Sequence, residues 1–327
     1  TNLDYIYNEV RAINPKIPER FGTKKYDIIM GNPPFNQEKQ GSHTGSTSNK
    51  ELWLTFSLVS IDSLYDGGYL MFIHPQNWRG LGPKFRVLWD LMKKYQLHFL
   101  HVFGEKDGRN YFKASTKFDL YIFQKKLNFK KTMFIDMLGV SHQLNLKKYN
   151  FLPNYNIAKI NKILTDEDKG LDVIYDTKYH TQKPGNISIE AWWMRDIQKP
   201  RGAFKYPVVH TITQRGLGLW HTNDMSRGHF NIKKVLLNKN QYQYPFNDHT
   251  GKYGMTQVTF GLPVSSKKEG DLIVRAINTP EFKEIIKATK WGAFETDWRM
   301  FKYFKKDFWK EFVSTKPQLK TKKKSDR

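Results

Sequence analysis

Residues 26–35 read YDIIMGNPPF. The apolar run at its start has the length of a buried strand, and Gly31 followed by two prolines ends it. In an open α/β sheet, ligands collect at the carboxyl ends of the strands. The side chains and carbonyls that follow this predicted strand are therefore the first candidates for a functional site. These residues are Asn32, Pro33, Pro34 and Phe35.

Short apolar runs continue to alternate with helical stretches as far as residue 126. Between the runs, residues 50–65 and 83–95 place apolar side chains near helical spacing, and in the first stretch these are Leu52, Phe56, Val59 and Leu64. This alternation predicts an α/β fold with a parallel sheet, specifically half of a doubly wound, Rossmann-like sheet. The further predicted strands are YLMFIHP at 69–75, which follows the turn at 66–68, LHFLHVF at 97–103 and FDLYIFQ at 118–124.

The two prolines make the turn after the first strand rigid. They fix φ near −65° and remove two backbone donors, so the turn presents acceptors. Asn32 adds a side-chain carbonyl, Pro33 a backbone carbonyl, and Phe35 an aromatic face. Such a corner suits a planar exocyclic amine. Two acceptors gripping its hydrogens would direct the nitrogen lone pair at an electrophile, while the ring stacks on the base.

With this corner, the sequence resembles the S-adenosylmethionine-dependent amino-methyltransferases of DNA, specifically the adenine-N6 type of restriction-modification systems. The resemblance extends to DGGYLMFIHPQNWR at 66–79 and YFKASTKFDLYIFQK at 111–125. It implies that Asn32 and Pro33 hold the adenine amine, and that Phe35 stacks on a base flipped out of the duplex. It also implies S-adenosylmethionine as the cofactor.

The resemblance assigns three more aromatic residues. Phe56 would pack on the adenine of the cofactor, and Phe112, with Tyr111 as its rival, would meet the flipped base from its far side. The alternative for Phe56 and Phe112 is a plain core aromatic.

The glycine-rich cofactor loop of the family is not visible. Thirty-one residues precede Asn32, fewer than three strands and two crossovers need. The glycine clusters at 216–218 and 251–254 do not follow a strong strand and open a helix. We therefore expect the first strands to come from an upstream region or a second polypeptide, and the chain alone to bind S-adenosylmethionine weakly or not at all.

Composition points to an anionic partner. The chain has 327 residues, with 54 Lys plus Arg against 31 Asp plus Glu and a net charge of +23. Duplex DNA fits this charge. The chain has no Cys, which excludes disulfides and thiolate sites, and the spacing of its His residues suggests no metal site. With neither an apolar span nor a signal core, we expect a cytoplasmic protein without membrane contact.

The alternation fades after about residue 150. We expect the carboxyl half of a methyltransferase domain at 1–150, an α+β target-recognition domain at 151–315, and a disordered basic tail at 316–327. A helix is predicted over 280–290, where Phe282, Ile285 and Ile286 share one face.

Four arginines in the second half are candidates for contacts with DNA. The alternative for each is a solvated charge or a salt bridge. Trp192, Trp193 and Trp291 are candidate stacking residues, with a core position as the alternative. The four arginines are Arg195, Arg215, Arg227 and Arg299.

Adenine-N6 methylation of duplex DNA is therefore the leading interpretation. Two alternatives stay open. One is a methyltransferase acting on another amine, in RNA guanine or protein glutamine. The other is a non-catalytic specificity subunit or fragment that binds DNA.

Overall fold

The computed structural model describes residues 24–35, 51–175, 194–195, 197–239, 244–292 and 297–313. The predicted tail and both Trp192 and Trp193 lie outside these residues. The chain divides into two units. The first comprises Thr1–Tyr155 with Thr289–Ala293, and the second comprises Asn156–Ala288 with Phe294–Arg327.

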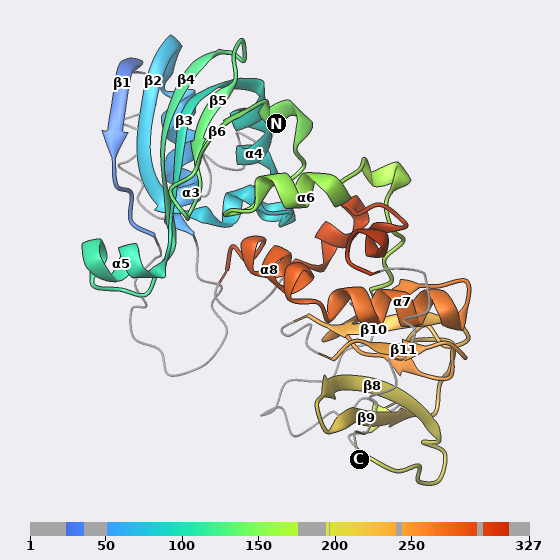
Figure 1. Cartoon of the computed structure of the whole chain (residues 1–327). Helices are drawn as coiled ribbons and strands as arrows, with labels where there is room; N and C mark the ends of the chain where they lie inside the picture. Colours follow the sequence, from blue (N-terminus) through green and yellow to red (C-terminus); the bar gives the residue numbers. More distant parts are fainter. Residues whose placement is uncertain are drawn as a thin grey trace, which may run out of the picture. The chain divides into compact units, whose positions relative to one another are not determined.

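The first unit is built on a six-stranded sheet with the strand order β1-β2-β4-β3-β5-β6 (Figure 1). β1 and β2 run parallel, as do β3 and β5, whereas β4 is inserted antiparallel between β2 and β3. The predicted α/β class is confirmed, and the sheet is mixed where the pattern predicted a parallel one. The strands are β1 (Tyr26–Gly31), β2 (Leu64–Pro75), β3 (Tyr95–Phe103), β4 (Phe118–Leu127), β5 (Thr132–Ile135) and β6 (Ser141–Leu144).

Strand β2 starts earlier than the sequence predicts. The residues expected to form a turn at 66–68 lie inside the strand, where Gly67 has φ +87° and the pairing with β1 shifts its register. A glycine that tolerates positive φ lets the strand pass through this irregularity instead of turning.

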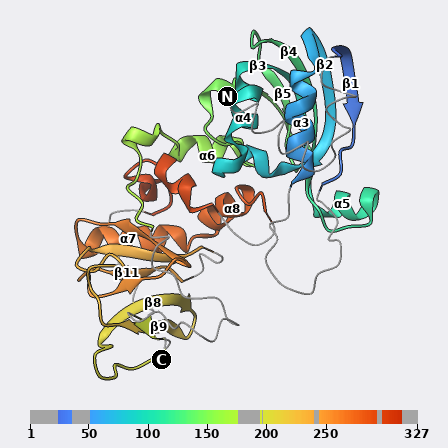
Figure 2. The ribbon, with the colours of Figure 1, turned by 180° about the vertical axis from the view of Figure 1, so that it is seen from behind.

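Helices α3 and α4 cover one face of this sheet, as Figure 1 and Figure 2 show from opposite sides. In α3 the buried residues are Trp53, Leu54, Ser57, Leu58 and Ile61. Of the residues whose spacing predicted this helix, Leu52, Phe56 and Val59 lie on it and are half-buried, whereas Leu64 begins β2. The helical elements of this unit are α3 (Leu52–Asp62), η1 (Gln76–Arg79), η2 (Pro83–Phe85), α4 (Arg86–Lys94), α5 (Glu105–Phe112) and η3 (Leu146–Lys148).

The opposite face carries exposed apolar side chains. On β1, which is an edge strand among the described residues, Ile28 is 63% exposed and Met30 is 70% exposed. Their partners on β2, Tyr69 and Met71, are also exposed. Apolar side chains of a sheet normally lie under a second layer.

The second unit contains two small sheets. Their orders are β12-β8-β9-β7 and β11-β10-β13. The strands are β7 (Met194–Arg195), β8 (Tyr206–Thr213), β9 (Gly216–Thr222), β10 (Lys234–Asn238), β11 (Phe246–Asp248), β12 (Gly254–Met255) and β13 (Thr259–Pro263). The helical elements are α6 (Ile157–Ile163), η4 (Glu167–Lys169), α7 (Lys267–Ile277), α8 (Pro280–Ala288), η5 (Trp298–Tyr303) and η6 (Phe308–Glu311).

The helix predicted over 280–290 is confirmed as α8. Phe282, Ile285 and Ile286 are buried on one face, as expected. Phe282 packs against Phe301 and Phe308, with ring centroids 6.2 and 5.4 Å away. None of the described helices is long and apolar enough to cross a membrane.

Candidate functional site

The Asn-Pro-Pro-Phe corner, residues 32–35, directly follows the carboxyl end of β1. Gly31, the last residue of β1, pairs with Phe72 of β2, so the corner lies beside the carboxyl half of β2. Pro33 is buried, Asn32 and Pro34 are exposed, and Phe35 is half-buried. The buried proline anchors the turn, while the Asn32 amide stays accessible to a ligand.

Phe35 and Phe112 lie together although 77 positions separate them in the chain. Their ring centroids are 6.0 Å apart with an interplanar angle of 64°. Phe112 ends α5 and packs edge-on against Phe118 of β4, at 4.9 Å and 81°. Both rings are half-buried, so part of each remains accessible to a flat ligand.

The position of α5 follows from its ends. Asp107 accepts a hydrogen bond from the Gly104 N–H at 2.9 Å, which caps the start of the helix. At the other end Lys113 adopts φ 56° and stops the helix. A side chain at Gly108 would meet the Thr116 carbonyl at 2.0 Å, so the returning loop lies directly on this helix.

The other two predicted aromatics lie apart from this pair. Tyr111 is 69% exposed and stands edge-on to Phe103 and Phe118, each at 6.3 Å. Phe56 is half-buried on α3, and within the described part of the chain it makes no ring contact with Phe35 or Phe112.

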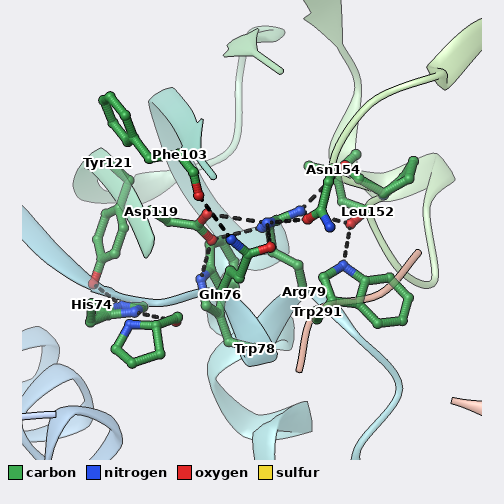
Figure 3. A network of polar contacts seen from close by, with 12 residues as sticks. His74, Gln76, Trp78, Arg79, Phe103, Asp119, Tyr121, Leu152, Asn154 and Trp291 are labelled. Carbon is green, nitrogen blue, oxygen red and sulfur yellow. Dashed lines mark hydrogen bonds and ion pairs between the residues drawn. The ribbon is translucent and has the colours of Figure 1, made fainter. Parts of the chain in front are cut away.

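A buried polar network that the sequence patterns did not predict lies where β2 ends and β4 begins (Figure 3). Arg79 Nε donates to Asp119 Oδ2 at 2.7 Å, and Arg79 Nη2 donates to Asp119 Oδ1 at 3.1 Å. Trp78 Nε1 donates to the same carboxylate at 2.9 Å. Burial raises the pKa of Asp119 and Arg79 opposes this, and with three donors facing it we take the carboxylate as ionised.

The same guanidinium reaches residues far along the chain. Arg79 donates to the Leu152 carbonyl at 3.0 Å and to Asn154 Oδ1 at 2.8 Å. Trp291 Nε1 also donates to the Leu152 carbonyl, at 2.8 Å. A carboxylate within the apolar run FDLYIFQ was the available signal, since a buried charge requires a partner.

His74 extends this network toward α3. Its Nδ1 lies 2.9 Å from the Pro75 carbonyl, which only accepts, so Nδ1 carries the proton and Nε2 accepts from the Tyr121 hydroxyl at 3.2 Å. The ring stacks on Trp53 at 4.6 Å. Burial lowers the pKa of His74 to about 4, so the ring is neutral at pH 7.

Two of the four candidate arginines pair with neighbouring carboxylates. Arg227 Nε lies 3.3 Å from Asp224, and Arg299 Nε donates to Asp297 at 2.7 Å. Arg215 lies at the exposed tip of the β8–β9 hairpin. The backbone of Arg195 lies in β7, and its side chain is outside the described residues.

Neither glycine cluster weighed for the cofactor loop opens a helix. Residues 216–218 start strand β9, and residues 251–254 lie in the loop before β12 and at its start. Within the described ranges, no group of three or more His, Cys, Asp or Glu side chains is arranged to hold a metal ion.

Residues 3–112 match the family model described as Eco57I restriction-modification methylase. This match includes the corner, α3 and α5, and it confirms the resemblance to a restriction-modification methylase over that stretch. A comparison with curated proteins gave no match.

Three solved structures of restriction-modification enzymes are similar to parts of the chain. The type I restriction enzyme EcoKI M protein has 24% identity over 33% of this chain and 22% of that chain, with a TM-score of 0.27. The type IIL enzyme MmeI in complex with DNA has 13% identity over 76% and 42%, with a TM-score of 0.37. The ATP-dependent type ISP enzyme LlaBIII bound to DNA has 14% identity over 77% and 24%, with a TM-score of 0.38. The chain spans less than half the length of each.

Proposed function

We propose that this chain is part of a restriction-modification DNA methyltransferase that transfers a methyl group to adenine N6 of a base flipped out of duplex DNA. The observation that carries the proposal is the corner at the carboxyl end of β1 with Phe35 in contact with Phe112. The family match over residues 3–112 supports the same class of reaction.

At the corner, Asn32 Oδ1 and the Pro33 carbonyl would each accept a hydrogen of the adenine amine. This grip favours a tetrahedral nitrogen and directs its lone pair at the methyl donor. Asn32 is exposed, so its amide can meet the base, and burial of Pro33 holds the turn that presents both acceptors. Phe35 and Phe112 contact each other in this structure. When the base is bound, each ring would give up that contact and stack on one face of the base.

S-adenosylmethionine would supply the electrophilic methyl group. The described residues fit only part of a site for it: Phe56 on α3 would pack on the cofactor's adenine, whereas no glycine cluster among them forms the expected loop. The exposed apolar side chains of Ile28 and Met30 on β1 support a further layer of strands and helices beside it, from an upstream region or a second polypeptide.

If part of the cofactor site comes from further strands, residues 1–327 alone should bind S-adenosylmethionine weakly. Isothermal calorimetry of this chain with S-adenosylmethionine should give no tight one-to-one complex. A tight complex would show that the cofactor site is complete without further strands.

The central test is methyl transfer from labelled S-adenosylmethionine to duplex DNA by the full-length protein. Asn32→Ala should lower transfer at least about 100-fold, as loss of one well-placed acceptor does in other preorganised sites, and DNA affinity should stay unchanged. Asn128→Ala, at a half-buried loop position after β4, is the matched control and should leave turnover unchanged.

Unchanged turnover of the Asn32 variant would refute the assigned role.

A second candidate function, a non-catalytic DNA-binding specificity module, is favoured by the lack of a cofactor loop among the described residues. DNA binding without any incorporation would support it. Label appearing in RNA or in a glutamine peptide instead of DNA would identify another amine substrate.

A further inference from the structure

The β8–β9 hairpin ends in an exposed polar tip. All four residues at 213–216 are exposed, and the turn itself consists of Gln214 and Arg215. Gly216 has φ +118°, which supplies the positive φ that the returning strand needs. Gln214 and Arg215 therefore keep ordinary negative φ, and a side chain of any shape is compatible with these positions.

The turn is held in one conformation by Thr213. Its Oγ1 accepts a hydrogen bond from the Arg215 N–H at 3.2 Å and donates to the Gly216 carbonyl at 3.2 Å. This side chain bonds the turn residue Arg215 and the flanking Gly216, so the backbone of the turn is preorganised.

The hairpin is also clamped two residues below its turn. Asn238, at the end of β10, accepts from the Ile212 N–H at 3.0 Å and donates to the Ile212 carbonyl at 2.7 Å. Ile212 is buried and packs with Val209 and Leu236. An exposed tip that is fixed this close to a core is suited to precise contacts with a partner.

The surrounding segment is strongly basic. Residues 201–258 contain eight Lys or Arg and two acidic residues, Asp224 and Asp248. Both carboxylates are engaged locally, with Arg227 at 3.3 Å and Lys234 at 3.0 Å. In the part of the chain that the structure describes, no carboxylate forms an ion pair with Arg215. The charge of this segment complements a polyanion.

We propose that the hairpin tip enters the major groove of duplex DNA, where Gln214 and Arg215 read neighbouring bases. The inference rests on the proposed function, which requires the protein to bind DNA. The major groove admits a two-stranded ribbon. Arg pairs bidentately with guanine and Gln pairs bidentately with adenine, so the tip would specify a guanine and an adenine at adjacent or nearby positions.

The test is selection from a library of randomised 20-base-pair duplexes at fixed salt, with the full-length protein. The wild type should enrich a motif. Arg215→Ala should lose the guanine preference at one position, a change of about 5- to 150-fold in discrimination, and Gln214→Ala should lose an adenine preference beside it. Arg215→Lys keeps the charge without the fork and should lose the guanine preference while total binding stays within a few-fold.

Lys233→Ala is the matched control, because Lys233 is an exposed cation of the same unit. It should weaken binding to all sequences equally, with an unchanged motif. Hydrogen exchange of peptides from β8 and β9 should be unchanged in every variant, which verifies folding.

The inference is overturned if the tip variants retain the wild-type motif, or if Arg215→Ala weakens all sequences equally, as a phosphate contact would. It is also overturned if the wild type enriches no motif. These failures differ from failure of the proposed function, which is measured separately by methyl transfer with the Asn32 variant.

Discussion

The Arg79–Asp119 pair of the first unit and the Lys234–Asp248 pair of the second are both buried, with side-chain exposures of 0% and 0%, and of 0% and 1%. The partners around them differ. Arg79 binds residues 40, 73 and 75 positions away, on a strand and on a distant loop. Lys234 binds Asp248 at 3.0 Å and the Ile232 and Tyr253 carbonyls, which are 2 and 19 positions away.

This difference separates two ways of using a buried charge. The planar guanidinium offers several donors in fixed directions, and here it joins the ends of β2 and β4 to the segment around Leu152. The ammonium is a point charge, and here it fixes one loop, because Asp248 also accepts from the Lys252 and Tyr253 N–H groups at 3.0 and 3.1 Å. The first pair holds together the strands and the segment beside the candidate site, whereas the second holds one loop in place.

The largest effect should follow from removing Asp119. Asp119→Ala leaves the Arg79 guanidinium buried without its carboxylate, which costs about 3–5 kcal/mol of folding free energy. Urea-dependent hydrogen exchange of peptides from β2 and β4 would measure the loss. Lys287→Ala, which breaks the exposed Lys287–Glu284 pair, is the control and should cost less than about 1 kcal/mol. A comparably small loss for Asp119→Ala would contradict the assigned role of the network.

The corner could be predicted from the sequence because its chemistry is contiguous: one strand, one turn and one ring occupy ten residues. The family resemblance assigned Phe35 and Phe112 to opposite sides of one base, and their direct contact was not predicted, since no local pattern joins positions so far apart. The apolar spacing over 50–65 predicted the helix α3 but not its end, because Leu64 continues the apolar pattern and yet begins β2. The Arg79 network was missed because its bonds join distant segments, and the insertion of β4 depends on tertiary pairing that periodicity does not encode.

Acid should weaken the first unit through His74. Burial holds its pKa at about 4, against 6.5 in an unfolded chain, so the unfolded state binds more protons between these values. The contribution of His74 to the free energy of unfolding is fully present above pH 6.5. It falls by about 3 kcal/mol in all as the pH falls toward 4. His74→Phe should remove this part of the pH dependence in β2 and β4 peptides. His249→Phe, an exposed histidine of the second unit, should not.

The smallest of the three effects should follow from removing the ammonium of the second unit. Lys234→Met keeps the buried stem and loses the bonds to Asp248 and to two carbonyls. Asp248 then retains the N–H groups of Lys252 and Tyr253 and the Thr250 hydroxyl, so its charge stays partly satisfied and the cost should be about 2 kcal/mol. Faster hydrogen exchange should be confined to peptides spanning 228–255. Exchange spreading instead through both sheets of the second unit would show that this pair, like Arg79–Asp119, holds a whole frame.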